Sequence, residues 1–188
     1  MGTRIVVTGI GIVSPIGLSA DTTWESLLAG RSGVDYISSF DPEPFETQIA
    51  AEVKGFEPTD FLDRKEARRM DRFVQFAAVA SQEAVARAGL DLDKEEAERV
   101  SVMIGSGIGG IRTLSQELQV MLERGPLKVS PFLIPMMLGD MASGRVSIML
   151  GAKGPNYSAI SSCATGADTI GEAAEVIRRG DADVAIAG

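Results

Sequence analysis

The only cysteine of the chain, Cys163, lies in the segment SSCATGADTIG, where a predicted strand gives way to a predicted helix. A sulfur at this place lies near unpaired backbone N–H groups and the positive end of the helix dipole, which stabilise a thiolate. The same N–H groups can hold the oxyanion of a thioester under attack. A lone cysteine is otherwise most often a small buried residue. The residues alone leave Cys163 open between these two interpretations.

The amino-acid composition excludes several kinds of functional site. The 188 residues contain no histidine, which excludes a Ser-His or Cys-His pair and the usual histidine-bearing zinc sites within the chain. The net charge of −8 argues against a nucleic-acid surface, because such surfaces need many Lys and Arg side chains. No apolar stretch approaches the roughly 20 residues of a membrane span, and no secretory signal opens the sequence. We therefore expect a cytoplasmic globular protein without a membrane partner.

A glycine-rich motif, GSGIGG at 105–110, follows a predicted strand and precedes a predicted helix. It satisfies the G-x-G-x-x-G pattern of dinucleotide-binding turns. That fingerprint also needs an acidic residue at the end of the next strand, about 20 residues on, and here the window holds a helix followed by GPLKVSPF. We favour a tightly packed turn beside a pocket. A dinucleotide-binding domain is kept as an alternative.

Basic residues recur at helical spacing on a chain that is otherwise acidic: Arg64, Lys65, Arg68, Arg69 and Arg72. A run of this kind is usually only a solvated helix face. A local positive patch would also steer an acidic partner toward this surface. The pattern alone does not separate these two interpretations.

Strands and helices alternate along the chain and must position these residues. β-branched and apolar runs predict strands at 4–8, 49–53, 100–104, 157–161 and 183–187. Helical periodicity predicts helices at 22–29, 71–88, 137–150 and 164–179, and another from Ile111 to the Gly125-Pro126 stop. Thr22 and Glu25 fit a capping box for the first helix, and Gly30 and Gly89 fit the ends of helices. For the last helix the pattern predicts a buried stripe of Ala167, Ile170, Ala174 and Ile177.

The alternation of strand, glycine turn and helix is typical of the α/β class, with a mixed sheet flanked by helices in one domain over 1–188. The last predicted strand, VAIAG, reaches the end of the sequence without a turn or cap. An open sheet edge of this kind invites pairing. We therefore expect the natural polypeptide to continue, so that the domain is incomplete at its C-terminal end.

Several segments together resemble the beta-ketoacyl-[acyl carrier protein] synthase II family of the thiolase superfamily. They are VVTGIGIVSPIG, RRMDRFVQFAAVASQEAVARAGL, IGSGIGG, SPFLIP and GPNYSAISSCATGADTIGEAAEVIRRGDADVAIAG. The resemblance extends over essentially the whole chain. It implies the N-terminal half of a thiolase-like fold, which is half of a five-layer αβαβα architecture.

The resemblance also implies site residues. Cys163 matches the family's acyl-accepting cysteine, and its backbone N–H matches part of the oxyanion hole. The implied acyl pocket contains the gating residue Ile108 and a segment that reaches across a homodimer; its residues are Gly107, Ile108, Phe132, Leu133, Ile134 and Ser162. The residues implied to bind an acyl carrier protein are Lys65, Arg68, Arg69 and Lys128. No metal or organic cofactor is implied, because the phosphopantetheine arm arrives with the substrate.

The implied activity is that of an acyltransferase of fatty-acid biosynthesis. An acyl group moves to Cys163 and is then condensed with malonyl carrier protein by decarboxylation. Family members carry a second half that supplies histidines, a lysine and phenylalanine gates, so we expect this chain alone to lack condensation activity. A catalytically silent partner subunit of a condensing pair is a second alternative, disfavoured because such subunits characteristically lack the cysteine present here.

Overall fold

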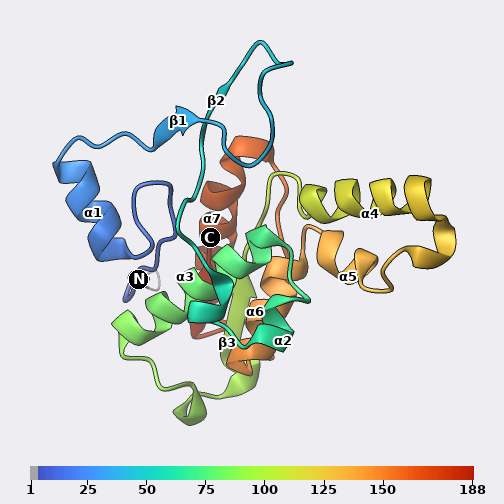
Figure 1. Cartoon of the computed structure of the whole chain (residues 1–188). Coiled ribbons are helices and arrows are strands. Elements are labelled where there is room, and N and C mark those ends of the chain that lie inside the picture. Colours follow the sequence, from blue (N-terminus) through green and yellow to red (C-terminus); the bar gives the residue numbers. More distant parts are fainter. Residues whose placement is uncertain (1–3) are drawn as a thin grey trace.

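The structure is a computed structural model that describes residues 4–188. The helices are α1 (Ala20–Leu28), α2 (Arg64–Ala67), α3 (Arg72–Ala88), α4 (Ile111–Arg124), α5 (Leu133–Met137), α6 (Met141–Leu150) and α7 (Thr165–Arg179). The strands are β1 (Val34–Tyr36), β2 (Ile49–Ala51), β3 (Val100–Met103) and β4 (Val184–Ala187). Figure 1 shows their arrangement, with the β1–β2 hairpin and α4 both extending from the body of the molecule.

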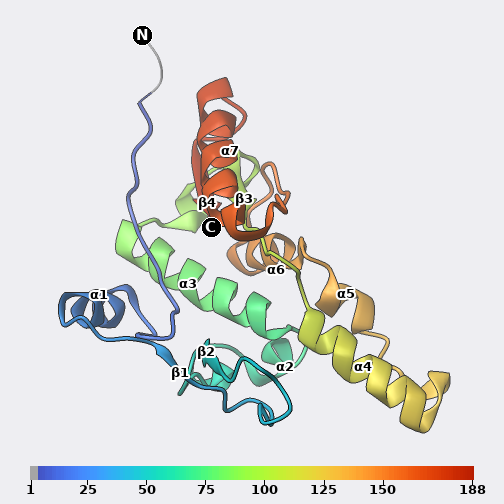
Figure 2. The same ribbon diagram turned by 90° about the horizontal axis from the view of Figure 1, so that it is seen from above.

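The centre of the molecule is a layered α/β unit. Strands β3 and β4 pair in parallel, with Val100 opposite Val184 and Met103 opposite Ala187. One face of this pair packs against α6, in a cluster that includes Val102 and Val146. The other face packs against α7, in a cluster of Met103, Ala173, Val176 and Ala182. Figure 2 shows the resulting order of α7, the strands, α6 and then α3.

Strand β3 is buried along its whole length, which explains why it is apolar at Val100, Val102 and Met103. Ser101 is the polar exception, and its hydroxyl donates to the carbonyl of Pro155 at 2.7 Å. At the entrance to β3, Arg99 makes two hydrogen bonds of 2.6 Å to the carboxylate of Asp183, which precedes β4. This pair aligns the two strands at one end.

A third cluster packs α3 on the segment that follows the hairpin. It contains Phe56, Leu62, Ala67, Met70, Val74, Ala78 and Val79. The guanidinium of Arg72 stacks over Phe56 and Phe76, each at 4.9 Å, and donates to the carbonyls of Val53 and Phe56. Burial in this cluster lowers the pKa of Arg72, and the nearby charge of Arg112 adds to that effect.

The predicted α/β class is confirmed, and several of the predicted elements are present. Asp71 caps α3, which begins at Arg72, and Gly89 ends this helix in the left-handed conformation, as the sequence predicts for Gly89. The helix predicted from Ile111 is α4, and strands β2, β3 and β4 lie within the predicted segments. In place of the predicted mixed sheet, residues 4–188 form two separate sheets, the antiparallel β1–β2 hairpin and the parallel β3–β4 pair.

Two predicted strands are wrong. The segment 4–8 is extended but pairs with no strand among the described residues, and Val6 and Val7 are 58% and 77% exposed. Gly9 and Gly11 instead lie against the backbone of α3, which leaves no room for a side chain. The segment 157–161 is also outside the sheet. Its approach to β3 ends at one bridge between Val102 and Asn156, next to Pro155, which has no N–H to extend a ladder.

The predicted boundaries also need correction. Helix α1 begins at Ala20, because Ser19 and Thr22 form the capping box in place of Thr22 and Glu25. The helix predicted over 137–150 is α6, which begins at Met141, and residue 137 is instead the last residue of α5. A glycine at 139, packed against Ile160, separates the two.

The stripe predicted for the last helix is wrong as well. The buried residues of α7 are Thr165, Thr169, Ala173 and Val176, whereas Ile170 is 56% exposed. Two threonines can be buried because their hydroxyls have partners. Thr169 Oγ1 lies 2.9 Å from the carbonyl of Gly188, and Thr165 Oγ1 lies 2.9 Å from the carbonyl of Ser162. A search for periodic apolar residues does not identify buried polar residues such as these threonines.

Candidate active site

Cys163 lies in a 3₁₀ turn, Ser162–Ala164, that leads directly into α7. Its side chain is exposed. The preceding residue, Ser162, has φ of +54°, and it is the only non-glycine residue with positive φ among residues 4–188. That conformation costs about 1 kcal/mol or more for a residue with a side chain. Here it turns the extended segment into the helix, so that the next residue projects outward at the helix start.

Polar side chains brace the backbone around the cysteine. The N–H of Ser161 donates to Thr165 Oγ1 at 2.9 Å, and that hydroxyl in turn donates to the carbonyl of Ser162. The hydroxyl of Ser161 also donates to the carboxylate of Asp168, in the first turn of α7. No side chain caps the amino end of α7 among the described residues. The positive end of the α7 dipole favours an anion at this place. The negative charge of Asp168 partly offsets that effect, because it repels another anion nearby.

The glycine-rich loop that follows β3 lies against this junction. A Cβ on Gly105 would lie 2.1 Å from Thr165 Cγ2, and one on Gly107 would lie 3.7 Å from the carbonyl oxygen of Ser162. Two of the predicted acyl-pocket residues, Gly107 and Ser162, are therefore neighbours beside Cys163. Ile108, the predicted gating residue, follows in the loop with 74% of its surface exposed.

A carboxylate already occupies the position that a dinucleotide phosphate would need. Asp71 accepts hydrogen bonds from the backbone N–H and the hydroxyl of Thr113, at 2.9 and 2.5 Å, in the first turn of α4. A phosphate bound after the glycine loop would meet this negative charge at the helix N-terminus. The geometry therefore argues against the dinucleotide alternative.

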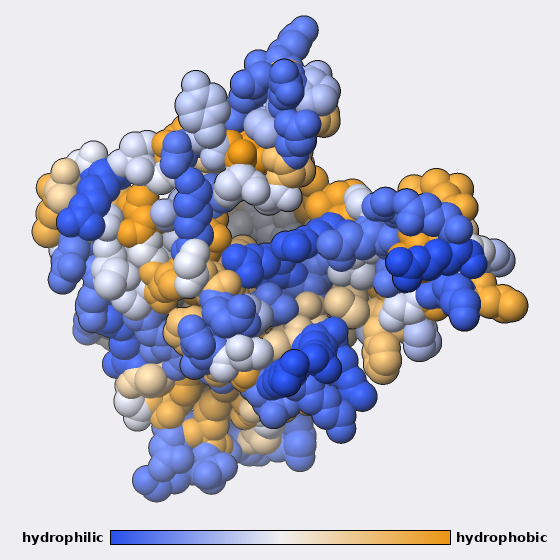
Figure 3. All heavy atoms as spheres, viewed as in Figure 1, coloured by the Kyte–Doolittle hydropathy of each residue, from blue (hydrophilic) through white to orange (hydrophobic). Residues whose placement is uncertain are grey.

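The basic residues line a groove beside α2. Its lining residues are Asp63, Arg64, Lys65, Arg68, Arg69 and Phe132. Figure 3 shows strongly hydrophilic side chains gathered over α2. The predicted site residues Lys65, Arg68 and Arg69 thus share one surface, and Arg69 stacks over the ring of Phe132 at 5.1 Å. Lys128, in the 3₁₀ turn Pro126–Lys128, is not one of the lining residues.

One member of the basic run faces elsewhere. Helix α2 ends at Ala67, so the regular spacing of the run is interrupted before α3 begins. Arg72 is consequently turned into the cluster with Phe56 and Phe76. The expectation that all five basic residues share one helix face is wrong.

The segment predicted to complete the acyl pocket is at the start of α5. Phe132 is the N-cap of this helix, Leu133 is half-buried, and Ile134 is 57% exposed. The end of α5 lies against the glycine loop, where the carbonyl of Met137 accepts from the N–H of Gly110 at 2.9 Å. Helix α5 thus connects the basic groove with the loop beside Cys163.

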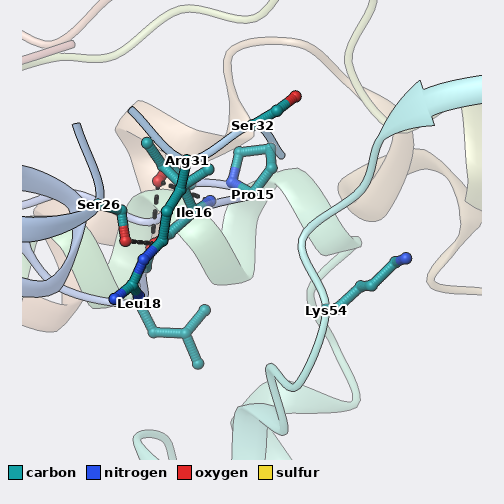
Figure 4. A pocket seen from close by; sticks show the side chains of 9 residues that line it. Pro15, Ile16, Leu18, Ser26, Arg31, Ser32 and Lys54 are labelled. Carbon is teal, nitrogen blue, oxygen red and sulfur yellow. Dashed lines mark hydrogen bonds between the residues drawn. The ribbon is translucent and has the colours of Figure 1, made fainter. Parts of the chain in front are cut away.

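A second pocket lies beside α1, and its lining residues are remote in sequence from Cys163 and the glycine-rich loop. It is lined by Ser14, Pro15, Ile16, Gly17, Leu18, Ser26, Arg31, Ser32 and Lys54. In Figure 4 Lys54 lies across the pocket from Ser26 and Arg31, and its ammonium is paired with Asp35 at 2.7 Å. None of the predicted site residues lines it.

Comparison with known proteins identifies the unit that holds this site. The family described as beta-ketoacyl synthase, N-terminal domain, matches residues 2–188. The chain belongs to this family.

Relatives of this beta-ketoacyl synthase domain share its sequence and fold. The chain is 51% identical to the 3-oxoacyl-[acyl-carrier-protein] synthase 2 of Staphylococcus aureus (strain COL), over 98% of this chain and 45% of that protein. Two solved structures superpose on it. The ishigamide ketosynthase/chain length factor has a TM-score of 0.92 and 29% identity, over all of this chain and 47% of that chain. A beta-ketoacyl synthase from Burkholderia phymatum STM815 has a TM-score of 0.82 and 32% identity, over 97% and 45%.

The fold of the matched structures confirms the thiolase-like half that the resemblance implied. The chain spans slightly less than half the length of the relatives it matches. Between residues 4 and 188, no helix has the length and apolar character required to cross a membrane.

Three residues of the site were missed from sequence. Asp168 and Ser161 brace the cysteine turn, and Asp71 connects α3 with α4. Asp71 stands at the predicted start of a helix, a place where an aspartate is ordinarily a local cap. Its second partner, Thr113, is 42 residues away, and no local pattern signals such a contact.

Proposed function

We propose that this chain supplies the nucleophile of a beta-ketoacyl-[acyl carrier protein] synthase of fatty-acid biosynthesis. The proposal rests on one observation above all, the exposed Cys163 presented by a left-handed Ser162 at the start of α7. A thiol in that place is accessible to a large thioester, and the N-terminus of α7 favours the negative charge that develops during attack. The name of the relatives, 3-oxoacyl-[acyl-carrier-protein] synthase 2, supports the same chemistry.

The first step is an acyl transfer. The thiolate of Cys163 attacks the thioester carbonyl, forms a new carbon–sulfur bond and expels the phosphopantetheine thiolate of the carrier, which takes up a proton. Backbone N–H groups beside the cysteine stabilise the oxyanion of the tetrahedral intermediate. The exposed position of Ile108 and the closeness of Gly107 to Ser162 support an acyl chain that runs along the glycine-rich loop.

The second step needs groups from outside this chain. Malonyl carrier protein loses carbon dioxide, and the resulting carbanion attacks the acyl carbonyl, which releases Cys163 as a thiolate and leaves a beta-ketoacyl thioester. The 188 residues contain no histidine to promote the decarboxylation. Condensation therefore requires the second half that the resemblance implies, and no metal or organic cofactor enters either step.

The proposed carrier partner fits the charge of the groove beside α2. Acyl carrier proteins are acidic, and Arg64, Lys65, Arg68 and Arg69 concentrate positive charge on a chain of net charge −8. Lys128 supplies a further cation outside the groove. The complete enzyme works in the cytoplasm as a homodimer, with Phe132, Leu133 and Ile134 in the segment shared with the partner subunit.

Intact-mass analysis tests the acyl transfer. The protein is incubated with an acyl carrier protein loaded with a saturated acyl chain, both as this chain and extended to the length of its relatives. The expected result is one acyl adduct on Cys163, found by peptide mapping and lost in Cys163→Ser. An unmodified cysteine in the extended protein would refute the proposal and favour a silent partner subunit.

Charge reversal tests the docking groove. Lys65→Glu combined with Arg69→Glu should weaken carrier binding about tenfold at low salt and reduce its salt dependence. The matched control reverses Lys94 and Lys153, two exposed lysines outside the groove. Equal affinities for the two double variants, measured by titration of labelled carrier protein, would refute the docking role.

A further inference from the structure

Asp71 is unusual among the buried residues. It has 6% of its surface exposed, and it is the only charged side chain in the buried part of residues 4–188. Burial of a carboxylate is costly unless hydrogen bonds replace its water. The position of Asp71 must therefore be specified by its partners.

These partners belong to two helices. One carboxylate oxygen, Oδ1, accepts from the N–H of Phe73 in the first turn of α3 at 3.4 Å. The other, Oδ2, accepts from the N–H and the hydroxyl of Thr113 in the first turn of α4, at 2.9 and 2.5 Å. Gly110, the N-cap residue of α4, has no side chain that could accept a hydrogen bond from the first turn of this helix. One carboxylate thus caps α3 locally and α4 from a distance.

The second cap fixes one end of the glycine-rich loop. A Cβ on Gly110 would lie 3.1 Å from Oδ2 of Asp71 and 2.4 Å from the carbonyl oxygen of Met136. The N–H of Gly110 donates to the carbonyl of Met137, at the end of α5. Gly110 is therefore enclosed between Asp71 and α5, with no room for a larger residue.

The opposite end of the loop lies at the cysteine turn. Gly105 packs on Thr165, the first residue of α7, and Gly107 lies against Ser162. Ile108 stands between the two fixed ends, and its side chain is largely exposed. Displacement of Asp71 would consequently be transmitted to the residues that border the approach to Cys163.

We propose that Asp71 is a positioning residue for Cys163: through Thr113 it holds loop 105–110 in place and so sets how large a group can reach the thiol. As an account of acyl-chain selection, this inference rests on the proposed function. As an account of access to the thiol, it stands on the contacts alone. Asp71 touches neither the thiol nor the substrate and acts through the loop.

The test measures the size of reagent that reaches Cys163 in the protein at the length of its relatives. Alkylation by iodoacetamide and by the bulky N-(1-pyrenyl)maleimide is followed on the peptide that contains Cys163. Asp71→Asn removes the charge of the carboxylate that anchors the loop, and Thr113→Val removes the hydroxyl hydrogen bond to it while the backbone one stays. The rate with the bulky reagent, relative to iodoacetamide, should rise about threefold or more. Thr113→Ser keeps the hydroxyl and should restore the original ratio.

Ser143→Ala is the matched control for stability. This buried hydroxyl donates to the carbonyl of Val102 at 2.6 Å, a contact that includes no residue of loop 105–110, so its loss should lower Tm without changing the ratio. Should Thr113→Val lower Tm and leave the ratio unchanged, Asp71 would be only a stabilising residue and the inference would fail. Thr113→Val also decides the case if Asp71→Asn does not fold.

The two proposals fail separately. A thiol whose alkylation ratio responds to Thr113→Val but which accepts no acyl group from a carrier protein would refute the proposed function and retain the positioning role. Acylation that is selective for chain length in the unmodified protein, with the same selectivity in Thr113→Val and Asp71→Asn, would refute the positioning role alone.

Discussion

Helices α4 and α7 have similar lengths and both carry an apolar stripe, but they are anchored differently. The buried face of α7 packs on β3 and β4 through Ala173 and Val176. The stripe of α4 is 38% to 50% exposed, at Ile111, Leu114, Leu118 and Met121. In Figures 1 and 2 α4 extends from the body of the molecule, and its own buried residue is Thr113.

The comparison separates two meanings of amphipathic periodicity. In both helices the pattern predicts helical structure correctly. It does not predict burial, which depends on whether a neighbouring element is available to cover the stripe. Cys163 stands at the start of the helix that is packed on the strands, so its position is determined within this chain. The stripe of α4 needs a cover that the described residues do not supply.

The largest expected effect concerns the contact between the glycine loop and α7. In Gly105→Ala the new methyl group would lie 2.1 Å from Thr165 Cγ2 and 2.7 Å from the carbonyl oxygen of Ala159. Thr165 is buried, so it has no space to move aside. We expect a loss of about 3 kcal/mol in the free energy of unfolding, measured with urea, together with altered alkylation of Cys163.

Gly144→Ala in α6 is the control for this change. Apart from its chain neighbours and the backbone of α6 itself, no atom lies within 4 Å of the added methyl group, and the residue is inside a helix. This variant should gain about 0.5 to 1 kcal/mol, because alanine loses less backbone entropy than glycine. A cost for Gly105→Ala below that of an ordinary surface substitution would show that α7 is not held by the loop.

A matched pair of truncations measures the difference between the two helices directly. Val176→Ala removes two methyl groups from a side chain that is 1% exposed and should cost about 2 kcal/mol. Leu118→Ala removes more atoms from a side chain that is 48% exposed, yet it should cost less than about 0.5 kcal/mol. Urea unfolding at several protein concentrations checks both. Equal costs that depend on concentration would show that another copy covers α4.

Much of this fold could be predicted from local signals. Helix α3 carries both its cap residue, Asp71, and its terminating glycine, Gly89, in the sequence. Strand β3 is marked by a mostly apolar run because both of its faces are buried. The segment 4–8 carries a similar run and forms no strand, since a ladder depends on a partner that local sequence does not identify.

The site was predicted less completely. The sequence placed Cys163 near a helix start, and the structure agrees, although α7 begins at Thr165. The left-handed Ser162 could not be predicted, because nothing in its residue type favours positive φ. The contact between Asp71 and Thr113 also depends on how α3 and α4 meet in space. The roles of Gly107, Ile108 and the basic residues stay predictions.

The smallest expected effect concerns an exposed contact, Glu52 at the β1–β2 hairpin. Hydrogen bonds from Ser39 and Ser38 lower the pKa of Glu52 from its ordinary value of 4.5 to about 2. Because the folded pKa is depressed, these bonds stabilise the protein fully above about pH 4.5 and are lost as the pH falls toward 2. Glu52→Gln should therefore be slightly less stable than the parent at pH 7, and the difference should shrink between pH 4.5 and pH 2. Urea unfolding across this range checks the trend against Glu46→Gln, an exposed carboxylate of the connecting loop. If the difference in stability is the same at all pH values, Glu52 does not make this contact as a carboxylate in solution. If the difference at pH 7 is large, exposure does not weaken this contact in the way that it weakens the contribution of the α4 stripe.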